Sequence, residues 1–143
     1  MSNDQVRLST VPRVSERDVQ TVTGSYEALN RGDVDGAMAA LAEDAEWHES
    51  EVLPETGVYR GRESIRSFLT DFLASWEKFH QEIEETRFSG DRVAVLIHLT
   101  ARGRESSAEV DARYAHVWQM RDGLGVRVDA YYDRDEALAA IEP

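Results

Sequence analysis

The strongest periodic pattern in the chain is a stripe of apolar residues between residues 62 and 76. Its members recur at intervals of three and four residues, which is the spacing of one face of an α-helix. They are Ile65, Phe68, Leu69, Phe72, Leu73 and Trp76. The pattern predicts an amphipathic helix that buries this stripe against a sheet.

Two further helices are predicted near the N-terminus. The residues from Ser15 to Asp18 have the form of a capping box, and an apolar stripe with helical spacing follows them until Gly32. Asp33 can cap a second, shorter helix, which should end near residue 44. The residues before Ser15 show no periodicity, so we expect residues 1–14 to form a flexible arm and residues 15–143 to form a single domain.

Alternation of apolar and polar residues predicts five strands in the rest of the chain. A short strand covers 45–49, a turn-rich loop at 50–61 lines or covers a pocket, and four longer strands lie at about 78–88, 92–103, 108–121 and 124–132. Asp133 caps a short C-terminal helix. The resulting order, ααβαββββα, predicts an α+β fold in which a curved antiparallel sheet carries helices on one face and closes a cone-shaped pocket.

Strand 108–121 has one face that is clearly more apolar than the other. Its members are Val110, Ala112, Tyr114, His116, Trp118 and Met120. Because alternate residues point to opposite sides of a strand, this face should look toward the helices and carry His116 inside. By the same parity, Trp47, Glu49 and Tyr132 point inward. Strand 92–103 is apolar on both faces, so alternation does not show which way His98 points. An apolar outer face needs cover, which predicts a homodimer through that face of the sheet.

Charge and composition exclude several classes of function. The formal net charge is -12, and the chain has no cluster of Lys and Arg, so neither nucleic acid nor an anionic membrane is an expected partner. The absence of cysteine excludes disulfides and thiolate chemistry. We find no secretory leader or spanning segment and expect a cytoplasmic protein. Scattered histidines give no metal-ligand pattern, so no metal site is predicted.

Four segments resemble the ketosteroid isomerase-like superfamily, also called nuclear transport factor 2-like, and especially its SnoaL-like polyketide cyclases. They are 26–33, 41–47, 59–65 and 116–123, within a resemblance that covers roughly residues 16–140. The resemblance implies a cystatin-like roll that needs no metal or organic cofactor. It places the general base of ketosteroid isomerase on Glu49, its protonated oxyanion-hole acid on His116, and its oxyanion-hole tyrosine on Ser25, one residue before Tyr26.

These observations favour a cofactor-independent acid/base enzyme, an isomerase, cyclase or related lyase or hydrolase, that acts on a hydrophobic small molecule. Glu49 would be the base and His116 would polarise or protonate the developing oxyanion. The predicted substrate-binding residues are Tyr26, Trp47, Leu69, Phe72, His98, Tyr114, Trp118 and Tyr132. Two alternatives remain open: a non-catalytic small-molecule-binding domain, and a dimerisation domain of the same fold. In these, His116 is a core histidine and Glu49 a carboxylate at the rim.

Overall fold

The computed structural model describes residues 14–49 and 57–142. Within them the order of elements is ααββαββββα. The elements are α2 (Glu16–Asn30), α3 (Val34–Met38), β1 (Leu41–His48), β2 (Val58–Arg60), α4 (Arg62–Ala74), β3 (Trp76–Ser89), β4 (Arg92–Gly103), β5 (Glu109–Arg121), β6 (Leu124–Tyr131) and α5 (Arg134–Ala140). Residues 1–13 of the expected arm and most of the expected 50–61 loop lie outside the described residues.

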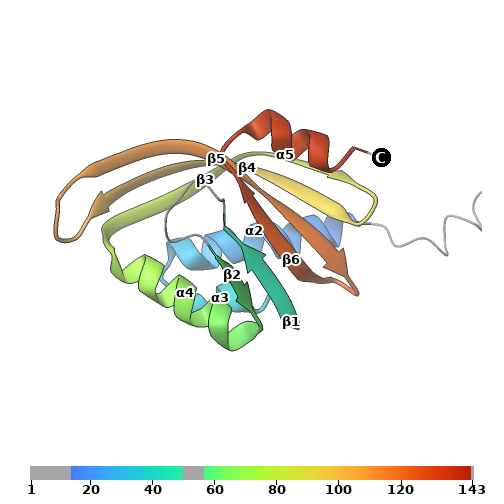
Figure 1. Cartoon of the computed structure of the whole chain (residues 1–143), viewed down its shortest axis with the longest axis horizontal. Helices are drawn as coiled ribbons and strands as arrows, with labels where there is room; N and C mark the ends of the chain where they lie inside the picture. The colour runs from blue at the N-terminus through green and yellow to red at the C-terminus, as the bar shows by residue number, and fades with distance from the viewer. Residues whose placement is uncertain (1–13, 50–56, 143) are drawn as a thin grey trace, which may run out of the picture.

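The strands form one curved six-stranded sheet in the order β2-β1-β6-β5-β4-β3 (Figure 1). The predicted α+β class with a curved sheet is confirmed. The sheet is mixed, however, because β1 and β6 run parallel, with Trp47 opposite Val128. The expectation of a wholly antiparallel sheet was wrong at this one junction, since alternation within a strand does not report the direction of its neighbour.

The start of the sheet differs from the prediction at two places. The second helix ends at Met38, and Leu41 already belongs to β1. The residues that follow Met38 are apolar and fit either a helix or a strand, and pairing of Leu41 with Gly125 on β6 favours the strand. β2 lies inside the expected loop and pairs with β1, with Tyr59 opposite Trp47. Its three residues are too few to show an alternating pattern.

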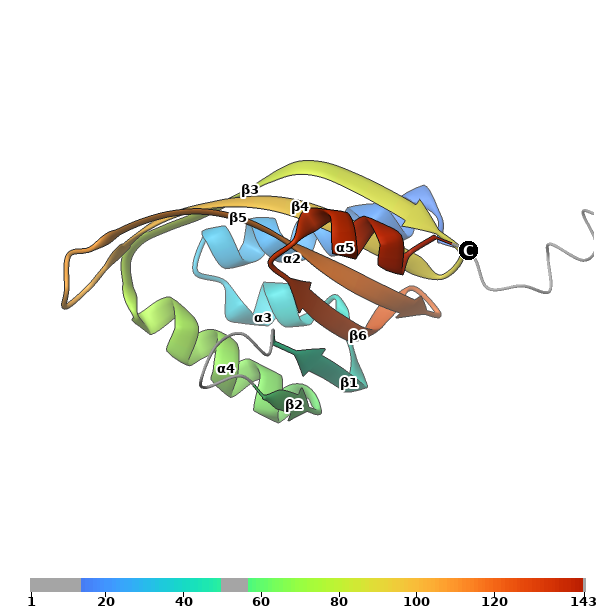
Figure 2. The ribbon, with the colours of Figure 1, turned by 45° about the horizontal axis from the view of Figure 1, so that its top comes forward.

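Helices cover both faces of the sheet. α2, α3 and α4 lie on the concave side, whereas α5 lies across the convex side (Figures 1 and 2). The convex cluster consists of Ala94, Leu96, Ala115, Val117, Ala137 and Ile141. The expectation of helices on one face only is therefore corrected. α5 also supplies an intramolecular cover for the outer apolar residues of β4, and the homodimer through the sheet stays a prediction.

Capping residues at the start of α2, α3 and α5 agree with the sequence. Ser15 and Asp18 form the expected capping box, in which Ser15 N donates to Asp18 Oδ2 at 3.0 Å and Asp18 N donates to Ser15 Oγ at 3.2 Å. Asp33 caps α3 and Asp133 caps α5. These local hydrogen bonds satisfy amide groups that have no partner within the helix. They are local contacts that mark where these three helices begin.

The close packing of Trp118 against β6 gives a test of the core. A methyl group added at Gly125 would lie 2.6 Å from Trp118 Cε3 and 2.8 Å from Cζ3. Trp118 is 1% exposed, so its indole has little room to move. We expect Gly125→Ala to lower the free energy of unfolding by about 1–3 kcal/mol, measured by urea denaturation.

The matched control is the same substitution inside α2. A methyl group at Gly24 contacts nothing within 4 Å, so Gly24→Ala should raise the free energy of unfolding by about 0.5–1 kcal/mol through the higher helix propensity of alanine. If the two variants were equally stable, the proposed contact between β6 and the Trp118 indole would be contradicted.

Candidate active site

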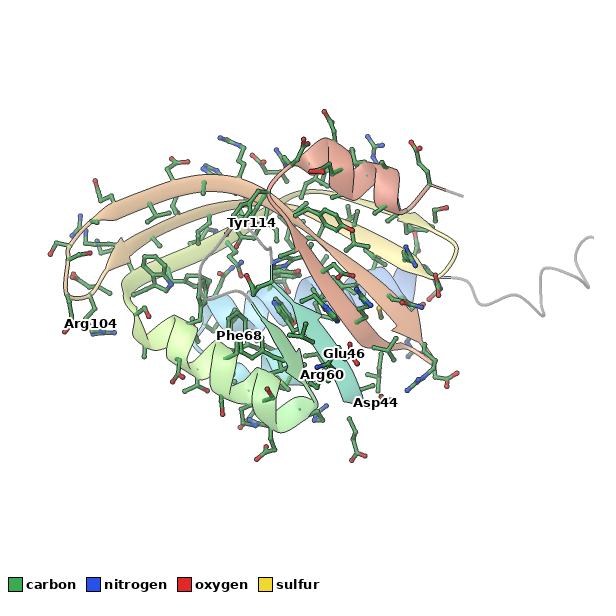
Figure 3. The ribbon with its side chains drawn as sticks, in the orientation of Figure 1. Asp44, Glu46, Arg60, Phe68, Arg104 and Tyr114 are labelled. Atoms are coloured by element: carbon green, nitrogen blue, oxygen red, sulfur yellow. The ribbon has the colours of Figure 1, made fainter. Side chains whose placement is uncertain are left out.

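A cavity of about 500 Å³ lies between the concave face of the sheet and the helices below it. Most of its wall is apolar or aromatic. Figure 3 shows Phe68 directed from α4 toward this space and Tyr114 on β5 above it. Nine of the ten predicted site residues line the cavity: Tyr26, Trp47, Glu49, Leu69, Phe72, Tyr114, His116, Trp118 and Tyr132. The predicted inward face of β5 is therefore correct.

His98 is the exception, because it lies on the outer face of the sheet. The inward residues of β4 have odd numbers, among them Ile97 and Leu99, so His98 points away from the cavity. Its Nε2 lies 2.7 Å from Asp111 Oδ1 on β5. The expectation that His98 binds substrate is corrected. Strand periodicity alone could not place it, since both faces of β4 are largely apolar near the centre of the sheet.

Several residues of the cavity wall were missed by the sequence reasoning. Phe68 stacks on Tyr59, with ring centroids 4.4 Å apart and planes at 22°. Trp76 and Gln81 come from β3. A signal for Gln81 was present, because it shares its inward parity with Phe79 and Ile83, which pack against the core. A single amide on an otherwise apolar strand face indicates a specific polar role.

His116 lies at the centre of a buried chain of hydrogen bonds. Trp118 Nε1 donates to the Tyr26 hydroxyl oxygen at 2.8 Å, and the same hydroxyl lies 2.7 Å from His116 Nδ1. An indole nitrogen can only donate, so the Tyr26 proton is free to reach Nδ1. Because the Tyr26 hydroxyl has no other acceptor among the described residues, we assign the tautomer in which Nδ1 accepts from it and Nε2 carries the imidazole proton. Nε2 makes no hydrogen bond with a described residue, and it can donate to a molecule in the cavity.

The imidazole of His116 is neutral at physiological pH. Burial lowers its pKa to about 3, because no carboxylate pairs with the ring to stabilise its charged form. The side chain is 5% exposed and its Nδ1 is already bonded to Tyr26. A neutral His116 can therefore donate a hydrogen bond through Nε2 without supplying a positive charge.

Glu49 lies just beyond the end of β1, at the edge of the cavity. Burial raises the pKa of its carboxyl group, and the hydrogen bond from Trp47 Nε1 to Glu49 Oε1, 2.6 Å long, partly offsets the rise. Its second oxygen makes no hydrogen bond within the described part of the chain. A carboxylate with a raised pKa and a free oxygen is suited to accept a proton.

Glu49 and His116 share the cavity without contacting each other through a hydrogen bond in the described residues. The negative charge of Glu49 is close enough to raise the pKa of the phenols around the imidazole. Burial raises the pKa of Tyr26, and the negative charge of Glu49 adds to that rise. The space between carboxylate and imidazole is where a ligand can contact both groups.

The resemblance placed the oxyanion-hole tyrosine of ketosteroid isomerase at Ser25, but the Ser25 hydroxyl is used within the fold. Its hydroxyl donates to the Ala37 carbonyl oxygen at 2.9 Å and so joins α2 to α3. The next residue, Tyr26, brings its phenol to the imidazole. A phenol is therefore present beside His116, but it is one position further along the helix than the resemblance implied.

One group of described side chains has the composition of a cation site. Glu82, Glu84 and His98 hold possible ligand atoms within 4.8 Å of one another. The group lies on the outer side of the sheet, apart from the cavity, and Glu84 already pairs with Arg113 at 3.3 Å and Arg134 at 2.9 Å. These ion pairs join β3 to β5 and to α5, which accounts for the carboxylate at this position.

The curved mixed sheet, with helices closing a cavity on its concave face, defines the nuclear transport factor 2-like and ketosteroid isomerase-like class of fold. Within this class the chain belongs to the SnoaL-like domain family, whose model matches residues 22–128. The resemblance inferred from the sequence is confirmed. None of the described helices is long and apolar enough to span a membrane.

Three solved structures illustrate the likeness. An NTF2-like protein of unknown function from Burkholderia pseudomallei K96243 is 26% identical, with 91% of this chain and 100% of that chain covered and a TM-score of 0.74. TerC co-crystallised with polyporic acid is 22% identical, with coverage of 87% and 97% and a TM-score of 0.73. A hypothetical protein with a ketosteroid isomerase-like fold from Catenulispora acidiphila DSM 44928, in complex with trimethylamine, is 18% identical, with coverage of 85% and 91% and a TM-score of 0.71. No curated protein sequence matches the chain.

Proposed function

We propose that this chain is an acid/base enzyme that moves a proton at the carbon atom next to a carbonyl group of a hydrophobic small molecule. The proposal is based on one observation. A carboxyl group with a raised pKa, Glu49, and a neutral imidazole with a free N–H, His116, line the same apolar cavity. Isomerisation, ring closure and elimination of carbonyl compounds can each begin with a step of this kind.

The chemistry divides between these two groups. Glu49 takes a proton from the carbon next to the carbonyl, and the electron pair of the broken C–H bond moves onto the carbonyl oxygen. His116 Nε2 donates a hydrogen bond to that oxygen as its negative charge develops, which stabilises the enolate. When the enolate is conjugated with a double bond, return of the proton from Glu49 to a different carbon gives an isomer. When the enolate carbon attacks a second carbonyl, a ring closes and the new alkoxide oxygen takes the proton back from Glu49. Neither route requires electron transfer.

Tyr26 and Trp118 hold the imidazole in the orientation that this role needs. Their hydrogen bonds keep the proton of His116 on Nε2 and leave Nδ1 as an acceptor. Trp47 packs against the imidazole ring with centroids 5.1 Å apart and also donates to Glu49. The donor and the base are thus both positioned by aromatic residues that belong to rigid strands and to α2.

The proposal is tested by hydrogen exchange at carbon. 2-Tetralone is a bicyclic aromatic ketone, small enough for the cavity, whose α-protons exchange slowly with D₂O and can be followed by NMR. We expect the protein to accelerate this exchange above the rate in buffer that contains the same concentration of heat-denatured protein. Equal exchange rates in the two samples would contradict the proposed acid/base activity.

A second function, binding without chemistry, is favoured by two details. Glu49 Oε1 is already engaged by Trp47, and no hydrogen bond joins Glu49 to His116 among the described residues. The co-crystal of TerC suggests polyporic acid, a dihydroxybenzoquinone with two phenyl rings, as a binding probe. Quenching of tryptophan fluorescence by polyporic acid, together with no exchange of 2-tetralone, would favour a binding domain.

A further inference from the structure

The last residue of α2, Asn30, is joined to the edge of the sheet by two hydrogen bonds. Its Nδ2 donates to the Gln81 carbonyl oxygen at 2.9 Å, and Gln81 N donates to its Oδ1 at 2.8 Å. β3 is an edge strand, so the Asn30 amide takes the place of a neighbouring strand at this one residue. A primary amide offers a donor and an acceptor side by side, which lets asparagine satisfy both backbone groups at once.

The helix itself does not need an asparagine at this position. Asparagine is one of the weaker helix formers. The end of α2 is already closed by backbone hydrogen bonds from Arg31 N and Gly32 N to carbonyl oxygens of the last turn. The feature that uses the Asn30 amide is therefore its contact with β3.

Asn30 belongs to the turn of α2 that follows Tyr26. The two residues are four positions apart, so their side chains leave the same face of the helix, one turn apart. The Tyr26 hydroxyl lies 2.7 Å from His116 Nδ1, and the phenol ring stacks on the imidazole with centroids 5.8 Å apart. A shift of the end of α2 relative to β3 would therefore move the Tyr26 hydroxyl relative to the imidazole.

The contact with Asn30 also fixes the backbone from which the Gln81 side chain reaches a second phenol. Gln81 lies opposite Leu99 on β4, and its Nε2 crosses that strand to donate to the hydroxyl oxygen of Tyr114. The Tyr114 ring packs against the His116 imidazole with centroids 5.3 Å apart. Asn30 is thus connected to both phenols that pack against the imidazole, to one through α2 and to the other through Gln81.

Stability alone does not explain the Gln81 side chain. It is 5% exposed, and its Oε1 has no hydrogen-bond partner in the described part of the chain. A buried amide oxygen without a partner costs free energy, whereas an apolar side chain would fill this place between Phe79 and Ile83 without that cost. What the amide adds is its hydrogen bond to Tyr114.

We propose that Asn30 is a positioning residue of the candidate active site. By joining α2 to β3, it keeps Tyr26 and Tyr114 in place against the imidazole of His116. The hydrogen bond from Tyr26 then holds the imidazole proton on Nε2. The catalytic consequence rests on the proposed function, in which Nε2 acts on the substrate, whereas the control of the imidazole by Asn30 depends on no substrate.

The test observes the imidazole directly. Long-range ¹H–¹⁵N NMR of labelled protein distinguishes the two ring nitrogens of each histidine, and the signals of His116 are those absent from His116→Gln. In the wild type we expect a protonated Nε2 and an Nδ1 whose signal is shifted by the hydrogen bond from Tyr26. In Asn30→Ala the Nδ1 signal should move toward that of an acceptor without a partner.

The same variant is then tested for exchange of 2-tetralone. We expect its exchange rate at saturating probe to fall about tenfold to a hundredfold, because a small displacement of a group that acts on the substrate is enough for such a loss. If Asn30→Ala fails to fold, Asn30→Asp is used in its place. Aspartate keeps the acceptor for Gln81 N and loses the donor to the Gln81 carbonyl, so it should show the same changes to a smaller degree.

The matched control is Ser15→Ala, at the other end of the same helix. It removes the capping hydrogen bond to Asp18 N, so it weakens α2 without touching β3. Both Ser15→Ala and Asn30→Ala should unfold at a lower urea concentration than the wild type. Only Asn30→Ala should change the His116 signals and the exchange rate.

A second variant separates the two connections. Gln81→Met keeps the backbone pair with Asn30 and removes the contact with Tyr114. The Nδ1 signal of His116 should stay at its wild-type position in this variant, while the ring signals of Tyr114 move. In Asn30→Ala both sets of signals should move, and unmoved Tyr114 signals there would overturn the connection through Gln81.

The remaining outcomes separate this inference from the proposed function. Unchanged His116 signals in a folded Asn30 variant overturn the positioning role, whatever happens to the exchange rate. Equal changes in Ser15→Ala also overturn it, since they would come from a weakened helix in general. If the His116 signals depend on Asn30 but the wild type does not exchange 2-tetralone, the acid/base chemistry is overturned and the positioning role stands.

Discussion

Glu49→Gln is expected to slow the exchange of the 2-tetralone α-protons by about 10²–10⁴, which is the usual loss when a general base is removed. Glutamine has the shape of glutamate and its oxygen can still accept from Trp47 Nε1, so the cavity should keep its form. What disappears is the ability of this position to take up a proton. The measurement is the NMR exchange rate at saturating and at low probe concentration.

The matched control is Glu46→Gln, on the opposite face of the same strand. Glu46 pairs with His48 at 2.8 Å and with Arg60 at 3.5 Å, away from the cavity. This variant should exchange 2-tetralone at the wild-type rate. An undiminished rate in Glu49→Gln would remove Glu49 from the chemistry and leave the cavity without its proposed base.

The pH dependence of the exchange rate gives an independent check on Glu49. Burial raises the pKa of its carboxyl group, so the rate should rise with pH in a window above that of an exposed glutamate. Trp47→Phe removes the hydrogen bond that lowers this pKa, so it should move the rise to still higher pH. A shift to lower pH would contradict the assigned direction of the Trp47 contact.

The second large effect expected is a loss of stability in mild acid caused by His116. The folded protein holds this imidazole neutral with a pKa of about 3, whereas in the unfolded chain it titrates near 6.5. The folded state therefore binds fewer protons, and the stability contributed by this group is complete above about pH 6.5 and is lost as the pH falls toward 3. Between pH 7 and pH 4.5 we expect a loss of about 2–3 kcal/mol from His116 alone.

The measurement is the free energy of unfolding by urea at several pH values, for the wild type and for His116→Gln. Acidic residues also titrate in this range, so the relevant quantity is the difference between the two curves. That difference should change by about 2–3 kcal/mol from pH 7 to pH 4.5. His80→Gln is the control, because it removes an imidazole that is exposed on β3. Parallel curves for His116→Gln would show that the imidazole is not held neutral.

Both large predictions follow from the way that a few polar groups are buried in an aromatic cavity. Burial raises the pKa of the Glu49 carboxyl and lowers that of the His116 imidazole. The first change makes the carboxylate a better proton acceptor, and the second keeps the imidazole available as a donor without charge. Burial of the imidazole also makes the protein sensitive to acid, because the folded state does not take up the proton that the unfolded chain binds as the pH falls.

Local patterns in the sequence were sufficient for the elements that form the cavity. The stripe on α4 and the alternating face of β5 each involve many residues, so their hydrophobic side could be assigned without knowing the neighbours. The assignment for β5 put Tyr114 and His116 inside, and parity along the short strand predicted at 45–49 did the same for Trp47 and Glu49. The structure places all four residues in the cavity wall. Short elements such as β2, and the apolar junction after Met38, carry too few residues for the same inference.

The sequence by itself determined which side of each long strand faces the core, because the side-chain direction alternates with every residue and burial of apolar surface selects one register. Only the tertiary structure decided which side chains meet across the sheet and between layers. It placed α5 over the convex face, turned His98 outward, joined Tyr26 to His116, and brought Gln81 on β3 to Tyr114 on β5. These contacts depend on strand order and helix position, and periodicity within a single element contains no information about either.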